Sequence, residues 1–177
     1  MKPVFYYFLV FSFVWTACPN QEINAEKQIK TIENKERTIF GNINQISANL
    51  PVIDVNMVKD LANQYEQFAY MFPRHEKTPE YLSRAANFYA SPNIKMYEKA
   101  ILIYDKLVKD YSKTQQAEKA CFMKGFIYHN ELKKIDKAKS AYEDFLRRYP
   151  NSQLVSSVQA ELQFLGTKPE DLPFLKK

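Results

Sequence analysis

The sequence contains few side chains whose type and spacing would support catalysis or metal binding. His75 and His129 lie far apart along the chain, and neither has a cysteine or carboxylate at the spacing of a metal-ligand set. Glu143 and Asp144 form an acidic pair, but no pattern places a second carboxylate opposite them. Cys121 lies on an apolar face among small residues, where a cysteine acts as a buried hydrophobe rather than a nucleophile. The sequence therefore predicts a protein with no enzymatic activity, metal or cofactor.

The composition points the same way. The chain has 177 residues, of which 46% are hydrophobic and 25% are charged, as expected for one folded domain. It contains only three glycines, too few for the glycine-rich loops that cradle phosphates or for many tight hairpin turns. This scarcity excludes P-loop and dinucleotide-binding folds, disfavours a β-sandwich and gives no reason to expect a small-molecule substrate.

The clearest chemistry lies near the amino terminus. Lys2 is followed by an apolar run over residues 4–15, which is too short to span a bilayer because a spanning helix needs roughly 20 residues. The run has the length of the apolar region of a secretory signal, and the small residues Thr16 and Ala17 follow it. Removal of residues 1–17 would take seven aromatic residues, including the only tryptophan, Trp15.

The junction between Ala17 and Cys18 resembles the lipobox of bacterial lipoproteins, in which the signal is cut before the cysteine. The resemblance implies that Cys18 is acylated and that several acyl chains attach the protein stably to a membrane. Pro19 is not the aspartate that favours inner-membrane retention, so we expect the outer membrane, on its periplasmic side. The alternative is an ordinary secretory signal that leaves Cys18 as a free thiol.

Residues 18–54 form a second segment of the chain. After Cys18 we expect a short polar tether and then an amphipathic helix over residues 23–40, with Ile29, Ile32 and Phe40 on one face. This helix is predicted to cap the domain that follows. Oligomerisation through it is disfavoured because its apolar pattern covers fewer than three heptads.

Three segments of the chain repeat one pattern without gaps. They begin at Val58, Tyr97 and Ile135, and four matched apolar positions in each recur at the spacing of one helical face. Each segment ends at Pro73, Ser112 or Pro150, where a helix should stop. The matched sets are Leu61, Ala100 and Ala138; Tyr65, Tyr104 and Tyr142; Phe68, Leu107 and Phe145; and Phe72, Tyr111 and Tyr149.

Partner helices are predicted between and after these segments, at about residues 78–90, 114–130 and 151–165. Thr78 and Thr114 have the residue type and position of N-caps. Gly125 lies inside the second partner helix, where a close helix crossing would exclude a side chain. Helix pairs at a period near 38 residues predict an all-α, right-handed α-solenoid over residues 55–166, with a tail at 167–177.

Residues 111–152 resemble a tetratricopeptide repeat of the longer type found in lipoproteins. Ala120 lies five residues before the helical Gly125, and the segment ends in Tyr149-Pro150-Asn151-Ser152. The end of the chain, residues 165–172, resembles small tetratricopeptide lipoproteins of Bacteroidetes-like bacteria. More distantly, the chain is similar to the BamD/ComL-type lipoproteins of outer-membrane β-barrel assembly, which hold more repeats. The resemblance implies membrane anchoring and protein binding.

In tetratricopeptide solenoids the first helix of each pair lines the concave side. On the helix from Thr114, the resemblance places a partner-binding stripe opposite the packing face. Exposed rings beside basic and amide groups would suit an extended peptide or a helix with some acidic character. The alternative is that the two phenylalanines pack beneath the neighbouring helix at residues 78–90. The stripe consists of Lys119, Phe122, Phe126, His129 and Asn130.

The net charge is +5, and the basic excess lies within residues 91–150. Lysines gather at Lys133, Lys134, Lys137 and Lys139, but acidic residues are interspersed among the basic ones, which argues against nucleic acid. A solvated surface is the expected role of these lysines, and contact with anionic lipid or an acidic protein is the alternative.

The sequence therefore predicts a lipid-anchored cell-envelope scaffold that binds a protein or peptide partner. Its role would lie in outer-membrane protein assembly or secretion. The alternative is a self-associating coordinator of peptidoglycan or envelope machinery that uses the helix at residues 23–40.

Overall fold

The computed structural model describes residues 19–41 and 54–167, and in these ranges the chain is helical without strands. The predicted signal segment, Cys18 and residues 168–177 of the tail lie outside the described residues. The helices are α1 (Pro19–Phe40), α2 (Val55–Met71), α3 (Thr78–Ala90), α4 (Tyr97–Asp110), α5 (Gln115–Phe126), η2 (Ile127–Glu131), α6 (Ile135–Arg148) and α7 (Val155–Gln163). The predicted all-α solenoid is confirmed.

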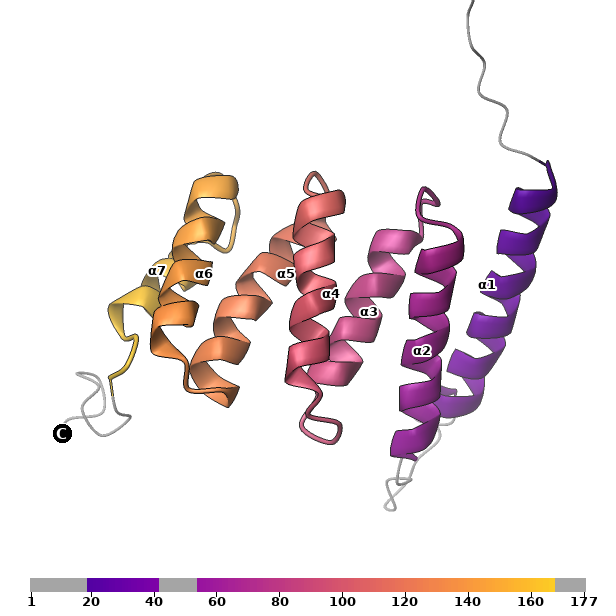
Figure 1. The fold of residues 1–177 in the computed structure, drawn as a ribbon, viewed down its shortest axis with the longest axis horizontal. Helices are drawn as coiled ribbons and strands as arrows, with labels where there is room; N and C mark the ends of the chain where they lie inside the picture. The colour runs from indigo at the N-terminus through magenta and orange to yellow at the C-terminus, as the bar shows by residue number, and fades with distance from the viewer. Residues whose placement is uncertain (1–18, 42–53, 168–177) are drawn as a thin grey trace, which may run out of the picture.

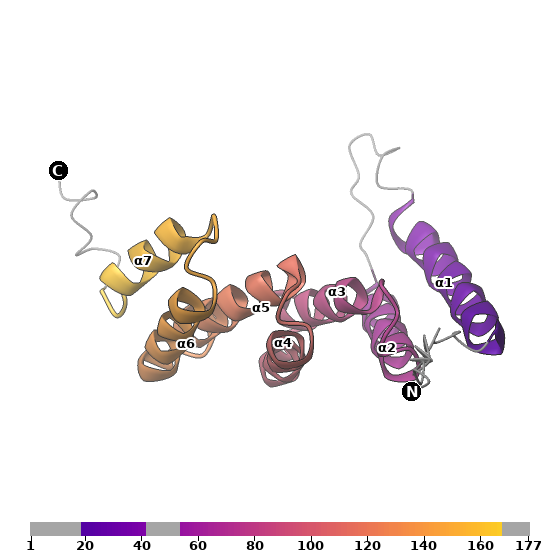
Figure 2. The ribbon, with the colours of Figure 1, turned by 90° about the horizontal axis from the view of Figure 1, so that it is seen from above.

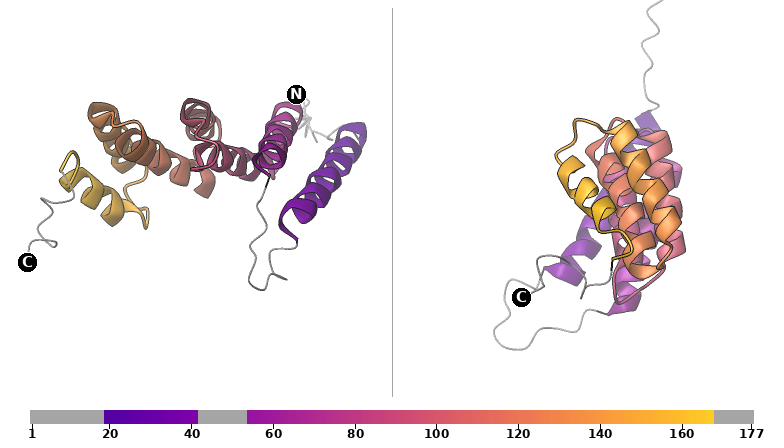
Figure 3. Two further views of the ribbon diagram at one scale, coloured as in Figure 1. Left: turned by 90° about the horizontal axis from the view of Figure 1, so that it is seen from below. Right: turned by 90° about the vertical axis from the view of Figure 1, so that its left-hand side faces the viewer.

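Successive helices run in opposite directions and stack side by side into an elongated array (Figure 1). Seen from above, α2, α4 and α6 form one layer, and α3 and α5 form the other (Figure 2). At the two ends, α1 and α7 incline toward the side of α3 and α5, so the array curves around that side (Figures 2 and 3). The inner surface is therefore lined by α3 and α5.

The repeated tyrosine of each segment is the centre of the core. Tyr65, Tyr104 and Tyr142 are at most 1% exposed, and each hydroxyl donates a hydrogen bond to a residue of a helix on the inner side. The acceptors are Glu36 Oε1 at 2.5 Å, Asn87 Oδ1 at 2.6 Å and Glu161 Oε2 at 3.3 Å. One stripe position thus fills the core and fixes the outer layer to the inner one.

A second repeated contact joins one helix pair to the next. The Tyr111 hydroxyl donates to the backbone carbonyl of Pro73 at 2.8 Å, and the Tyr149 hydroxyl donates to that of Ser112 at 3.3 Å. Each contact links the end of one repeated helix to the end of the preceding one. The apolar stripe therefore also sets the spacing between pairs.

The helix starts agree with the sequence in part. Thr114 is an N-cap, and its Oγ1 accepts a hydrogen bond from the Ala117 amide at 3.2 Å. The prediction for Thr78 is wrong, because Lys77 occupies the N-cap position of α3. Thr78 is fully buried and its hydroxyl donates to the Phe72 carbonyl at 2.6 Å, so it closes the turn between α2 and α3 instead.

At the amino-terminal end, α1 packs along α2 in the opposite direction (Figure 1). Ala25, Ile29 and Ile32 are buried, and the Phe40 ring lies 5.9 Å from that of Phe88. The helix begins at Pro19, earlier than predicted, and proline is well tolerated in a first helical turn. The predicted polar tether is therefore part of the helix, and α1 covers the end of the first pair.

Candidate partner-binding groove

The inner surface contains a cavity of about 240 Å³ between α3 and α5. Both helices present their partly exposed faces to it, and the start of the α7 segment closes one side. The lining residues combine polar groups from α3 with a lysine and apolar side chains from α5. They are Ser83, Asn87, Tyr104, Lys119, Ala120, Phe122, Met123 and Leu154, which we call the α3–α5 groove.

Asn87 presents hydrogen-bond donors to this groove. Burial raises the pKa of the Tyr104 hydroxyl above its ordinary value, so the phenol stays protonated and acts as the donor to Asn87 Oδ1. With its oxygen held in this way, the Asn87 amide nitrogen remains available to donate to a ligand. A buried tyrosine of the core therefore orients a polar side chain of the groove.

Lys119 adds a positive charge beside Asn87. Its side chain is exposed, and within residues 19–41 and 54–167 it belongs to none of the ion pairs, unlike Lys124 on the same helix, which pairs with Asp105 at 2.5 Å. An ammonium group and an amide nitrogen at the same groove can bind a carbonyl or a carboxylate.

The apolar wall of the groove consists of Phe122, Met123 and Leu154. All three are half-buried and pack against the hydrophobic core, and the Phe122 ring lies 6.1 Å from that of Tyr142. The Phe122 ring therefore has two roles, because it packs against the core and also lines the groove.

The other three predicted residues lie further along the same helix, outside the groove. Phe126 is half-buried but does not pack against the core cluster of the described residues. Asn130 Nδ2 donates to the Phe126 carbonyl at 3.2 Å, and His129 Nδ1 lies 3.3 Å from Glu161 Oε2 on α7. The structure thus brings Lys119 and Phe122 together and places His129 and Asn130 in internal contacts.

These last residues belong to a short π-helical turn. The Leu132 amide donates to the Ile127 carbonyl at 3.0 Å, five residues earlier, which widens the end of the helix. Such turns are frequent at functional sites. His129 lies in this turn and contacts Glu161, a contact that a regular helical pattern in the sequence does not predict.

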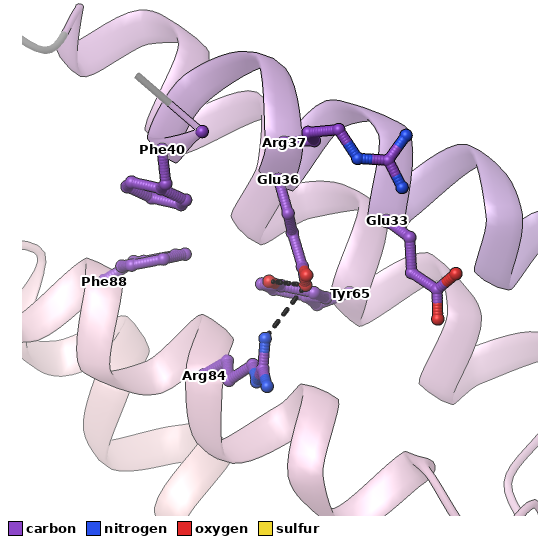
Figure 4. A pocket seen from close by; sticks show the side chains of 8 residues that line it. Glu33, Glu36, Arg37, Phe40, Tyr65, Arg84 and Phe88 are labelled. Carbon is purple, nitrogen blue, oxygen red and sulfur yellow. Dashed lines mark hydrogen bonds and ion pairs between the residues drawn. The ribbon is translucent and has the colours of Figure 1, made fainter. Parts of the chain in front are cut away.

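A second cavity, of about 480 Å³, lies between α1 and α3 (Figure 4). Glu36 is its central polar group and accepts hydrogen bonds from the Tyr65 hydroxyl and from Arg84 Nη1 at 2.9 Å. Arg84 Nη2 also contacts Glu80 at 2.6 Å, and the rings of Phe40 and Phe88 face each other across one side. Glu36, Tyr65 and Arg84 satisfy one another's hydrogen-bonding groups. These contacts hold α1 against α2 and α3.

Sequence reasoning missed this cluster, although it contained one usable signal. A buried tyrosine in a repeated core stripe needs an acceptor for its hydroxyl, and a polar residue on a neighbouring helix is one source of it. The acceptor for Tyr65 comes from Glu36 on the capping helix, 29 residues earlier.

Two observations on the described residues concern the thiol and the metal-ligating side chains. Burial raises the pKa of the Cys121 thiol to about 11, which keeps it protonated and unreactive at neutral pH. No group of three or more metal-ligating side chains gathers anywhere in the part of the chain that the structure describes. Within that part, no helix is both long and apolar enough to cross a membrane.

Comparison with known proteins identifies the repeat. The family described as tetratricopeptide repeat matches residues 119–152, which run from α5 through η2 and α6 to the following turn. This chain contains a tetratricopeptide repeat. No curated protein and no solved structure matches it significantly.

The matched tetratricopeptide unit includes the α5 half of the groove, with Lys119 and Phe122. It also includes Gly125, Ala138 and Tyr142, the residues at which α5 and α6 cross. Tetratricopeptide repeats form non-catalytic folds that bind other proteins. The match therefore supports a protein-interaction scaffold.

Proposed function

We propose that this protein is a lipid-anchored scaffold of the cell envelope that binds a protein or peptide partner in the α3–α5 groove. One observation carries the proposal: the groove on the inner surface of the solenoid has an apolar wall beside free hydrogen-bond donors. Elsewhere on this surface, Glu36, Tyr65 and Arg84 of the cavity between α1 and α3 are paired with one another.

The lining indicates the chemistry of the partner. Phe122, Met123 and Leu154 can accept one apolar side chain, while Lys119 and the Asn87 amide can bind a backbone carbonyl or an acidic side chain beside it. The partner is therefore an extended or helical segment that carries an apolar residue next to an acidic one.

The membrane part of the proposal rests on the sequence around Cys18. Acylation of Cys18 would attach the protein to the outer membrane, on its periplasmic side, and a partner there would belong to outer-membrane protein assembly or secretion. Similarity to small tetratricopeptide lipoproteins of Bacteroidetes-like bacteria, and more distantly to the BamD/ComL type, supports this assignment. Nucleic acid is not an expected partner in that compartment.

Self-association through α1 has less support. Its apolar stripe of Ala25, Ile29 and Ile32 is at most 3% exposed because it packs within the same chain. A coiled coil through this stripe would first require α1 to leave α2 and to break the contacts of Glu36. The inner groove requires no such rearrangement.

Two variants test the binding part of the proposal. Lys119→Glu reverses the charge in the groove, and Phe126→Asp places a carboxylate one helical turn beyond Phe122, where an acidic partner segment would leave the groove. Both should abolish or strongly reduce capture of the partner from a detergent extract of the envelope, while circular dichroism shows unchanged helicity. Lys109→Glu is the matched control, since Lys109 is an exposed lysine of α4 in the outer layer. Equal loss of capture in all three variants would argue against the groove.

The anchoring part is tested separately by Cys18→Ser. We expect this variant to appear in the soluble periplasmic fraction, with partner binding in solution retained. If it stays with the membrane after a carbonate wash, acylation of Cys18 is not what holds the protein there.

A further inference from the structure

Three large hydrophobic side chains are exposed at one corner of the solenoid. Ile23 in the first turns of α1 is 65% exposed, and Tyr70 and Met71 at the end of α2 are 87% and 45% exposed. None of them serves the groove or the core. Tyr70 is the most exposed of the large hydrophobic residues in the described ranges.

The antiparallel packing of α1 on α2 brings the parts of the two helices that carry these residues to one end of the array. The start of α1 and the end of α2 lie at the same edge of the array, the upper edge in Figure 1. Met71 and Phe72 line a cavity of about 650 Å³ together with Gln21 and Asn24 from the start of α1. We call Ile23, Tyr70 and Met71 the α1–α2 edge.

Chain geometry links this edge to the proposed anchor. Cys18 directly precedes Pro19, the first residue of α1, and consecutive Cα atoms are about 3.8 Å apart. A helix rises about 1.5 Å per residue, so Ile23, four residues after Pro19, lies within about 10 Å of the anchored residue. The headgroup layer of one leaflet is about 5–8 Å thick, so the edge can reach it.

The docking of α1 carries Tyr70 and Met71 to the same level. Ala25, Ile29 and Ile32 are buried against the first helix pair, and Glu36 contacts both Tyr65 and Arg84. Because α1 is fixed to the solenoid in this way, an anchor directly before its first residue brings this end of the array to the membrane. The end of α2 then faces the membrane beside the start of α1.

We propose that the α1–α2 edge contacts the headgroup layer of the membrane to which Cys18 is attached. This inference rests on the proposed acylation of Cys18. Tyrosine is enriched at membrane interfaces because its ring is apolar and its hydroxyl is polar. The charged residues of the first α1 turns and of the α2–α3 turn are three acidic and three basic ones, Glu22, Glu26, Glu76, Lys27, Arg74 and Lys77. They balance, so the contact is apolar and does not depend on lipid charge.

The direction of the groove follows from this contact. The α3–α5 groove is lined by two helices, and both α3 and α5 begin at the upper edge of the array and run away from it (Figure 1). With that edge on the membrane, the groove opens parallel to the membrane plane. It therefore stays accessible to a neighbouring envelope protein.

A tryptophan reporter tests the contact. Processing before Cys18 would remove the chain's only tryptophan, so Tyr70→Trp would create a single reporter in the full processed protein. The matched control is Leu102→Trp on α4, where the native residue is 69% exposed and lies away from this edge. Each variant is purified in detergent and reconstituted into vesicles of phosphatidylethanolamine and phosphatidylglycerol, with or without bromine on the upper acyl chain.

We expect bromine to remove most of the emission of the Tyr70→Trp variant and little of the emission of the Leu102→Trp variant. Vesicles of phosphatidylcholine alone should give the same result. Ile23→Trp provides a second edge reporter that should be quenched like the first. If both edge reporters escape quenching in vesicle-bound protein, the contact is refuted while the anchor stands. An emission that shifts to the blue but is not quenched would indicate a protein contact instead and would also refute it.

The unsubstituted protein distinguishes failure of the proposed anchor from failure of the edge contact. If it shows tryptophan emission, Trp15 has been retained, and if it fails to float with vesicles, it is not anchored. Either result refutes the acylated anchor and the edge contact together. Quenching of the Tyr70→Trp variant in protein that floats with vesicles supports both.

Discussion

The ring of Tyr142 occupies the space that a side chain at position 125 would need. An ideal Cβ atom on Gly125 would overlap three ring atoms of Tyr142. The tyrosine is fully buried and its hydroxyl contacts Glu161 on α7. Because neither α6 nor the ring can move away without breaking these contacts, glycine is required where α5 crosses α6.

Gly125→Ala should therefore destabilise the protein. Alanine would favour the helix by about 1 kcal/mol, but overpacking a buried crossing costs typically ~1–3 kcal/mol. We expect a lower midpoint of urea unfolding despite the better helix former. The control is Ala86→Gly, 39 residues earlier on α3, where the loss should be about 1–2 kcal/mol from helix propensity and from one buried methyl group. An increase in stability with Gly125→Ala would contradict the crossing.

Two tyrosines should respond in opposite ways to removal of the hydroxyl. Tyr104→Phe should cost about 1 kcal/mol, because Asn87 loses the donor that orients it. Tyr81→Phe should be neutral or stabilise by up to about 1 kcal/mol, because the buried Tyr81 hydroxyl has no hydrogen-bond partner among the described residues. Urea titration of both variants measures the difference, and equal losses would contradict the contacts.

Two lysines occupy the left-handed backbone region at equivalent turns between paired helices. Lys95 and Lys133 both have φ of 53°, a conformation that costs a non-glycine residue roughly 1–2 kcal/mol. Lys133→Gly should therefore raise the thermal midpoint. Lys134→Gly is the matched control, because Lys134 has φ of −96° and glycine there only adds freedom to the unfolded chain. Destabilisation by both substitutions would contradict the strained turn.

Stability should fall at alkaline pH. Burial raises the pKa of Cys121 from 9.0 to about 11, so above pH 9 the unfolded chain releases a proton that the folded chain retains. The stabilisation is complete below pH 9 and is lost as the pH rises through about 11. Cys121→Ala should reduce the slope of unfolding free energy against pH by up to about 1.4 kcal/mol per unit, as urea titrations between pH 8 and 10.5 would show. An unchanged slope would place the thiol in solvent.

The fold could be predicted from the sequence, because repeated apolar spacing records which face of α2, α4 and α6 is buried. The inner position of Lys119 and Phe122 was implied by the resemblance to tetratricopeptide repeats, since α5 lies outside the repeated segments. The sequence did not allow the contacts between distant helices to be predicted. Glu36 and Arg84 meet across 48 positions, and no local pattern marks them as a pair. The contact between His129 and Glu161 depends on a π-helical turn, which breaks the regular period on which the helical assignment relied.

Thr78 shows why helix starts are harder to predict than helix faces. A threonine before Pro79 has the type of an N-cap, yet its hydroxyl donates to the Phe72 carbonyl in the preceding turn. An N-cap hydroxyl accepts from a backbone amide of the helix, whereas the Thr78 hydroxyl donates to a backbone carbonyl of the turn. The path of the turn decides which of the two contacts forms.

Site-directed photocrosslinking in intact cells tests the central claim most directly, which is that the α3–α5 groove binds a protein partner. A photoreactive residue is placed at position 119 in the groove, or at position 109 on the outer layer as the control. We expect one discrete adduct of higher mass from position 119, its loss when Phe126→Asp is added, and no such adduct from position 109. No adduct from position 119, or the same adduct from both positions, would contradict the claim.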